Sequence, residues 1–271
     1  MSKRADHHLD RLRGTGQPAK EDVTGEALFS TLIWRLFLIW TAVGAFVMVA
    51  GITPANVGRW FASPDIQAFA VQFLGYADLI WMILAATLVY LRAVAMEGLG
   101  PARLAAAIIL IGSAIVEWVG AKTGVPFGPY VYTTAFGPRI LGVLPIAIPL
   151  AWLVILLGGR ILVLYFRPQI SRVGLSIWVA LIALLTDLNL EFVAWKIRGY
   201  WVWYPENRNP PAWPPLQNFI SWFVIAFLLH FLATRMRTYP SAREKIPRAA
   251  LVLPVMNALF LLLHAFVNLR R

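Results

Sequence analysis

The sequence predicts an all-α protein, a polytopic membrane helix bundle of about seven transmembrane helices with two aromatic, Pro/Gly-rich loops on one face. Hydrophobic residues make up 59% of the 271 residues and charged residues only 14%, whereas a soluble domain carries about 25% charged residues. The apolar residues also form runs of about 20 residues, the length an α-helix needs to cross a bilayer. We expect a polar cytoplasmic tail over residues 1–31 and a single transmembrane helical domain over residues 32–271.

Seven apolar runs account for the predicted helices in chain order. They cover residues 32–50, 66–91, 103–121, 141–165, 174–196, 217–234 and 249–268. Pro145 and Pro149 lie in the first half of the fourth run and are expected to kink it. The first two helices are expected to serve mainly as scaffold.

The basic residues indicate the orientation of these helices. With the N-terminus in the cytoplasm, the cytoplasmic segments hold about twice as many Lys and Arg residues as the opposite face, which is the bias of the positive-inside rule. The same distribution accounts for the net charge of +11 without a nucleic-acid partner. We therefore expect an integral membrane protein with a cytoplasmic N-terminus.

The sequence gives little support to metal chemistry. Cysteine is absent, so disulfides, thiolate metal sites and cysteine nucleophiles are excluded. His230 and His264 stand alone among leucines, and no histidine cluster or H-E-x-x-H motif has the spacing of a metal site. We expect no metal and no other cofactor.

Two unusual loops fall on the face opposite the cytoplasm. Residues 122–140 (KTGVPFGPYVYTTAFGPRI) and residues 197–217 (IRGYWVWYPENRNPPAWPPLQ) are rich in Gly, Pro and aromatic residues. One interpretation is an aromatic belt at the membrane interface. The other is that irregular backbone lines a cavity, where it is tolerated at membrane depth.

Acidic residues inside the apolar runs are the main functional signal. An acid at the centre of a membrane helix costs about 2.5–3.5 kcal/mol, so it is rare without a role. Glu117 lies near the outer end of the third helix, and Asp187 and Glu191 share one face of the fifth because they are four residues apart. We expect these three acids to gather beneath the loops.

Asp78 carries a weaker signal, because a single acid can be a helix-packing group bonded to a neighbouring side chain. Basic residues that could pair with one of the acids lie at the rim. They are Arg139, Lys196 and Arg198.

Carboxyl groups beneath aromatic loops suit acid catalysis on an apolar substrate. A carboxyl group in an apolar site tends to stay protonated near neutral pH and can act as a general acid. An ionised neighbour can act as a base or orient water, and aromatic faces stabilise a nearby cation. These features indicate an acid-driven reaction of a lipid-soluble alkene through a carbocation.

Several motifs also resemble a known family. They are EWVGAKTGVPFGPYVY (117–132), LGVLPIAIPLAW (141–152), TDLNLE (186–191), WVWYP (201–205) and NFISW (218–222). Over about residues 105–235 the chain is similar to the membrane carotenoid biosynthesis protein family, which includes the carotenoid 1,2-hydratases. The resemblance implies a cofactor-independent hydro-lyase in a prokaryotic inner (plasma) membrane. It would act on a carotene such as γ-carotene or lycopene, with other enzymes of carotenoid biosynthesis as partners.

The implied reaction adds water across the terminal C1–C2 double bond of an acyclic (ψ) end. Our chemical interpretation assigns Glu117 or Asp187 as the proton donor and Glu191 as the group that orients or deprotonates the water. The residues expected to bind the substrate come from the two loops and the start of the sixth helix. They are Thr123, Pro126, Phe127, Tyr130, Tyr132, Trp201, Trp203, Asn218 and Trp222.

Other functions remain alternatives at this point. A carotene end-group cyclase also protonates a ψ-end, and another carotenoid-modifying membrane enzyme or a non-catalytic carotenoid or lipid transporter or assembly subunit fits the hydropathy. A retinal-binding photoreceptor needs a Schiff-base lysine in its last helix, and residues 249–268 contain no lysine. A membrane prenyltransferase needs aspartate-rich magnesium sites, for which TDLNLE is too sparse.

Overall fold

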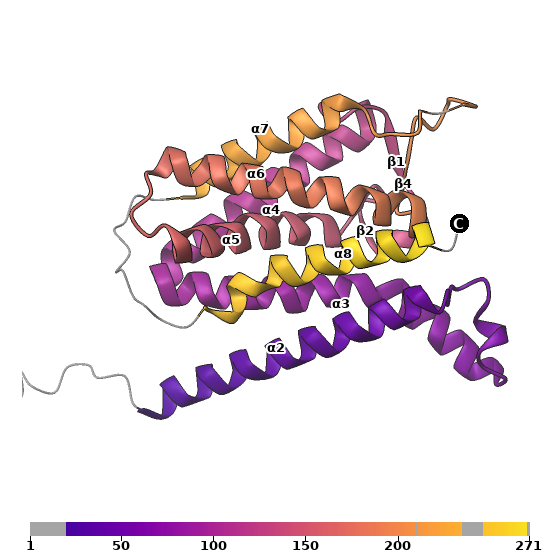
Figure 1. The fold of residues 1–271 in the computed structure, drawn as a ribbon, viewed down its shortest axis with the longest axis horizontal. Coiled ribbons are helices and arrows are strands. Elements are labelled where there is room, and N and C mark those ends of the chain that lie inside the picture. Colours follow the sequence, from indigo (N-terminus) through magenta and orange to yellow (C-terminus); the bar gives the residue numbers. More distant parts are fainter. Residues whose placement is uncertain (1–19, 210, 235–245, 270–271) are drawn as a thin grey trace, which may run out of the picture.

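The computed structural model describes residues 20–209, 211–234 and 246–269, and this part of the chain is mostly helical (Figure 1). The long helices are α2 (Lys20–Val49), α3 (Pro64–Glu97), α4 (Leu99–Thr123), α5 (Ala147–Phe166), α6 (Arg172–Glu191), α7 (Leu216–Ala233) and α8 (Val252–Leu269). Within the described residues, seven helices are long and apolar enough to cross a membrane. The predicted fold class is confirmed, and the seven candidate spans indicate an integral membrane protein.

The first helix begins before the apolar run does. Helix α2 starts at Lys20, inside the region predicted to be a polar tail, and its membrane-crossing part is Leu28–Val49. The rest of the predicted tail, residues 1–19, lies outside the described residues.

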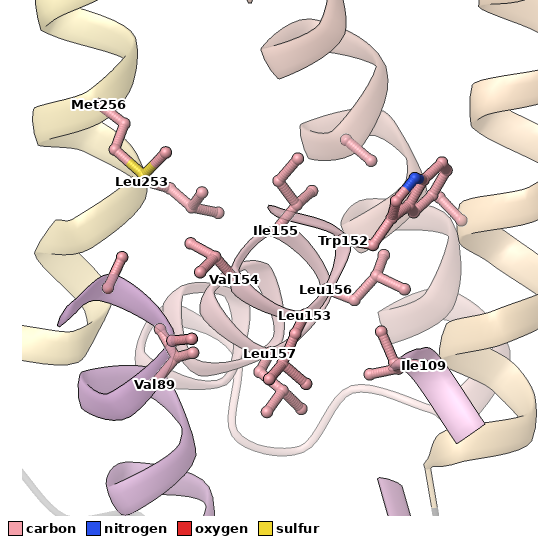
Figure 2. Close-up of a cluster of buried hydrophobic side chains, with 14 of the residues drawn as sticks. Val89, Ile109, Trp152, Leu153, Val154, Ile155, Leu156, Leu157, Leu253 and Met256 are labelled. Carbon is pink, nitrogen blue, oxygen red and sulfur yellow. The ribbon is translucent and has the colours of Figure 1, made fainter. Parts of the chain in front are cut away.

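Helix α5 lies at the centre of the bundle. Of the residues in its membrane-length segment, 83% are buried, whereas only 6% of those in α2 are buried. Residues 152–157 are consecutive, apolar and all buried, so α5 presents apolar side chains in every direction and packs against α3, α4, α6 and α8. Figure 2 shows this cluster, in which the side chains of α5 lie among Val89, Ile109 and Leu253.

The two prolines of the fourth run precede or begin α5 and do not kink it. Pro145 lies in the short strand β3 (Leu144–Pro145), which pairs antiparallel with β2 (Arg139–Ile140). Pro149 lies in the first turn of α5, where backbone N–H groups have no intrahelical acceptor and a residue without an N–H is tolerated. The predicted kink is therefore wrong, and residues 141–146 belong to the preceding loop.

The two aromatic loops meet in a second two-stranded ribbon. Strand β1 (Tyr130–Tyr132) pairs antiparallel with β4 (Trp201–Trp203). Side chains alternate between the faces of a strand, so the Tyr and Trp rings lie on one face, toward the bundle, while Val131 and Val202 are exposed. Main-chain hydrogen bonds thus join two loops that are far apart in the sequence.

Candidate active site

Glu117 is buried less than two turns before the end of α4. Its Oε2 accepts hydrogen bonds from the hydroxyls of Tyr130 (2.9 Å) and Tyr132 (2.8 Å), and its Oε1 accepts one from Trp152 Nε1 (2.8 Å). Strand β1 supplies two of these donors and α5 the third. Both carboxyl oxygens are therefore occupied.

The two tyrosines are fixed as donors to Glu117. Burial and the adjacent Glu117 charge raise the pKa of Tyr130 and of Tyr132 well above the usual tyrosine range, so both hydroxyls stay protonated. Gly120, less than one turn after Glu117, leaves room for the rings. A Cβ at this position would lie 2.7 Å from the Phe127 ring and 3.0 Å from the Tyr130 hydroxyl.

Asp187 and Glu191 form a second carboxyl pair, one turn apart on α6. The Nδ2 of Asn218, on α7, donates to Asp187 Oδ2 (2.9 Å) and to Glu191 Oε1 (3.3 Å). The indole nitrogens of Trp201 and Trp203 donate to Glu191 Oε2 at 3.2 and 3.0 Å. One ribbon therefore holds two carboxyl groups, with β1 on Glu117 and β4 on Glu191.

Asp187 differs from the other two acids in having a free oxygen. Within the described part of the chain its Oδ1 has no hydrogen-bond partner, although the residue is only 1% exposed. A buried polar atom without a partner costs about 1–3 kcal/mol, and such an atom on a residue that lines a cavity is a candidate for a catalytic role. Directly after Glu191 the helix changes to a π-helical turn, η3 (Phe192–Ile197), a feature frequent at functional sites.

The three acids line one cavity, with a volume of about 120 Å³ and mainly apolar walls. Most of the residues predicted to bind the substrate line it as well. They are Phe127, Tyr130, Tyr132, Trp201, Trp203, Asn218 and Trp222. The structure thus brings together residues from both loops and from α4, α6 and α7.

Thr123 and Pro126, also predicted to bind the substrate, shape the loop beside the cavity and do not line it. The Thr123 hydroxyl donates to the Val119 carbonyl (2.8 Å) at the end of α4. The Pro126 carbonyl accepts a hydrogen bond from Ser221 Oγ (2.7 Å) on α7.

The first two membrane helices contribute to the cavity, so the prediction that they serve mainly as scaffold is wrong. Trp40, Gly44 and Met48 recur every four residues on α2 and face the cavity together with Thr41. Helix α3 adds Ala77, Asp78, Trp81 and Met82. The four-residue spacing of the α2 residues is a sequence signal that could have indicated this face.

Asp78 pairs with one of the rim residues that were predicted to reach an acid. Arg198 Nη2 lies 2.8 Å from Asp78 Oδ2, and Arg198 Nε donates to the Tyr200 hydroxyl (2.8 Å). Both charged side chains line the cavity and are partly exposed, at 19% for Arg198 and 27% for Asp78. The cavity therefore reaches toward the surface at this ion pair.

The chain is similar to known proteins over much of its length. A family model described as "Carotenoid biosynthesis protein" matches residues 77–270. The bisanhydrobacterioruberin hydratase of Haloarcula japonica is 30% identical over 112 residues, which are 40% of this chain and 36% of that protein. The match thus spans little more than a third of the length of that relative. No solved structure matches the chain.

Proposed function

This chain belongs to the carotenoid biosynthesis protein family, and from that premise we propose that it is a membrane hydratase that adds water across the terminal C1–C2 double bond of an acyclic carotene end. One observation carries the proposal. Asp187 lines an apolar cavity and has a buried carboxyl oxygen without a partner among the described residues, and it shares Asn218 with a second carboxyl group. The similarity to a carotenoid hydratase supports the same reaction.

The first step is proton transfer to the alkene. The π electrons of the C1–C2 bond form a C2–H bond with the proton of Asp187, which leaves a tertiary cation at C1 and an ionised Asp187. We assign Asp187 rather than Glu117 as the acid because both oxygens of Glu117 already accept hydrogen bonds from three donors. A general acid must be within hydrogen-bond reach of the atom it protonates, and Asp187 Oδ1 is the carboxyl oxygen that has no hydrogen-bond partner among the described residues.

The second step is capture of the cation by water. A lone pair of the water oxygen forms the C1–O bond, and Glu191 accepts the proton that this water releases. The proton then returns to Asp187, one helical turn away, so that each turnover consumes one water and no other reactant. Asn218 donates to both carboxyl groups and keeps them at adjacent positions during this exchange.

Glu117 and the aromatic rings stabilise the cation in this scheme. The negative charge of Glu117 is held at the cavity by fixed donors that need no rearrangement during the reaction, which is the condition for effective electrostatic stabilisation. Trp152 and Trp222 stack with ring centroids 4.2 Å apart and line the same cavity. Aromatic faces of this kind attract a nearby cation.

Expression in a bacterial host that accumulates lycopene tests the proposal. We expect extracted pigment that is heavier by one water for each modified end, with an unchanged visible spectrum because the C1–C2 bond is not conjugated with the polyene. Incubation of membranes that contain the protein with unlabelled lycopene in deuterated water should place one non-exchangeable deuterium at C2. A product of unchanged mass with blue-shifted absorption would indicate a cyclase, and unmodified pigment in hosts that accumulate the protein, whether fed lycopene or γ-carotene, would refute the enzyme.

A further inference from the structure

The cavity accommodates only part of a long polyene. Its volume of about 120 Å³ is below the roughly 300–1,000 Å³ of pockets that enclose drug-sized ligands. On the proposed function, the reacting end of the carotene lies among the acids and the rest of the chain must pass through a wall of the cavity. An apolar chain is best accommodated where that wall faces lipid.

Helix α2 is the part of the wall that is least attached to the bundle. Only 6% of its span is buried, against 33–83% in the other six spans, and Figure 1 shows it at the edge of the bundle beside α3. Its attachments lie in its middle. Phe37 is fully buried against Trp81, Thr41 accepts a hydrogen bond from Trp81 Nε1 (2.8 Å), and Trp40 Nε1 donates to the Ala77 carbonyl (2.9 Å).

Beyond these attachments the inner face of α2 is open at Gly44, although Ala45 and Met48 pack against the core. Gly44 and Met48 line the cavity, and a Cβ placed on Gly44 would meet no atom within 4 Å. Helices α2, α4 and α6 all run toward the end of the bundle that carries the loops. The cavity that Gly44 and Met48 line is the one that holds Glu117 and Asp187. Helix α8, which packs on α2, forms the neighbouring wall with Met256, Leu259 and Phe260.

We propose that the polyene enters and leaves the cavity sideways from the bilayer, between α2 and α8, and that Gly44 determines the width of this opening. Glycine is unfavourable in the interior of a helix, and the empty space beside Gly44 is what a chain passing through the wall requires. Larger side chains at position 44 should therefore close the route without weakening the helix.

A series at this position tests the proposal. The series Gly44→Ala, Gly44→Leu and Gly44→Trp should lower carotene conversion progressively, with the smallest change for Ala and a loss of about tenfold or more for Trp. Ala42→Trp is the matched control because Ala42 lies on the exposed face of α2 and does not line the cavity. Conversion by Gly44→Trp at the rate of Ala42→Trp would overturn the proposal.

A binding measurement separates this inference from the proposed reaction. Wild-type protein and both Trp variants are purified from a lycopene-accumulating host, and the bound pigment is extracted and quantified per protein. Pigment retained by wild type and Ala42→Trp but lost from Gly44→Trp supports the lateral route, even if no hydrated product forms and the proposed function fails. Equal pigment on both Trp variants refutes the route.

Discussion

Replacing Asp187 by asparagine removes the proposed proton donor with the smallest change in shape. The asparagine carbonyl can still accept the hydrogen bond from Asn218 that Asp187 Oδ2 accepts at 2.9 Å. Its amide then lies where Oδ1 has no partner within the described residues. The substitution therefore tests the acid group and leaves the packing of the cavity in place.

The expected loss is in catalysis and not in folding. Removing a positioned general acid lowers a rate by about 10²–10⁴-fold, which corresponds to about 2.7–5.5 kcal/mol of activation free energy. The hydrogen bonds of the folded protein change by one neutral bond at most, or about 0.5–1.5 kcal/mol of unfolding free energy. Hydration should nearly stop while the amount of protein in the membrane stays close to that of wild type.

The assay follows hydrated pigment over time in the lycopene-accumulating host and normalises it to membrane-embedded protein. Asp65→Asn is the matched control, because Asp65 is exposed in the first turn of α3 and does not line the cavity. This control should hydrate at the wild-type rate. If Asp187→Asn forms product at more than about a tenth of the wild-type rate, Asp187 is not the general acid.

Three further experiments test the neighbouring groups. Glu117→Gln removes the charge proposed to stabilise the cation and should slow hydration about 100-fold, while the purified protein still retains pigment; an unchanged rate would refute this role. Tyr132→Phe deletes a 2.8 Å donor to Glu117 and should lower the free energy of unfolding by about 1.5–3 kcal/mol, measured in detergent against Tyr76→Phe on the exposed face of α3. A double-mutant cycle of Asp78→Asn and Arg198→Gln should give a coupling below about 1 kcal/mol because both side chains are partly exposed, and a coupling above about 2 kcal/mol would contradict this.

The sequence predicts the long elements of this fold and misses the short ones. All seven runs correspond to membrane-length helices, because about 20 apolar residues in lipid can satisfy their backbone groups only as a helix or a closed barrel. Residues 141–146 were wrongly predicted to be helical, because proline occurs both at the start of a helix and at a kink within one. The ribbon of β1 and β4 was not predicted because its strands have three residues each and are separated in the sequence by the helices α5 and α6.

The sequence identified some residue types of the candidate site and missed others. Glu117, Asp187 and Glu191 stand out because an acid in an apolar run is unusual. Trp152 does not stand out in the same way, since a tryptophan in a membrane helix is ordinary until the fold places its Nε1 at 2.8 Å from Glu117 Oε1. The sequence also left Glu117 and Asp187 equivalent as acids, because the number of donors around each carboxyl group depends on which elements meet there.

Two ion pairs among the described residues differ in their exposure and in their position relative to the cavity. Arg160 and Glu97 form an ion pair (Nη2–Oε1 3.0 Å) whose side chains are only 1% and 5% exposed. Glu97 is the last residue of α3 and Arg160 lies in the second half of α5, so this pair is remote from the loops. Neither residue of this pair lines the cavity, whereas the partly exposed Asp78–Arg198 pair beside β4 does. Water would then enter from the loop end while the carotene enters from lipid beside α2, so the two reactants would meet at the acids without sharing a path.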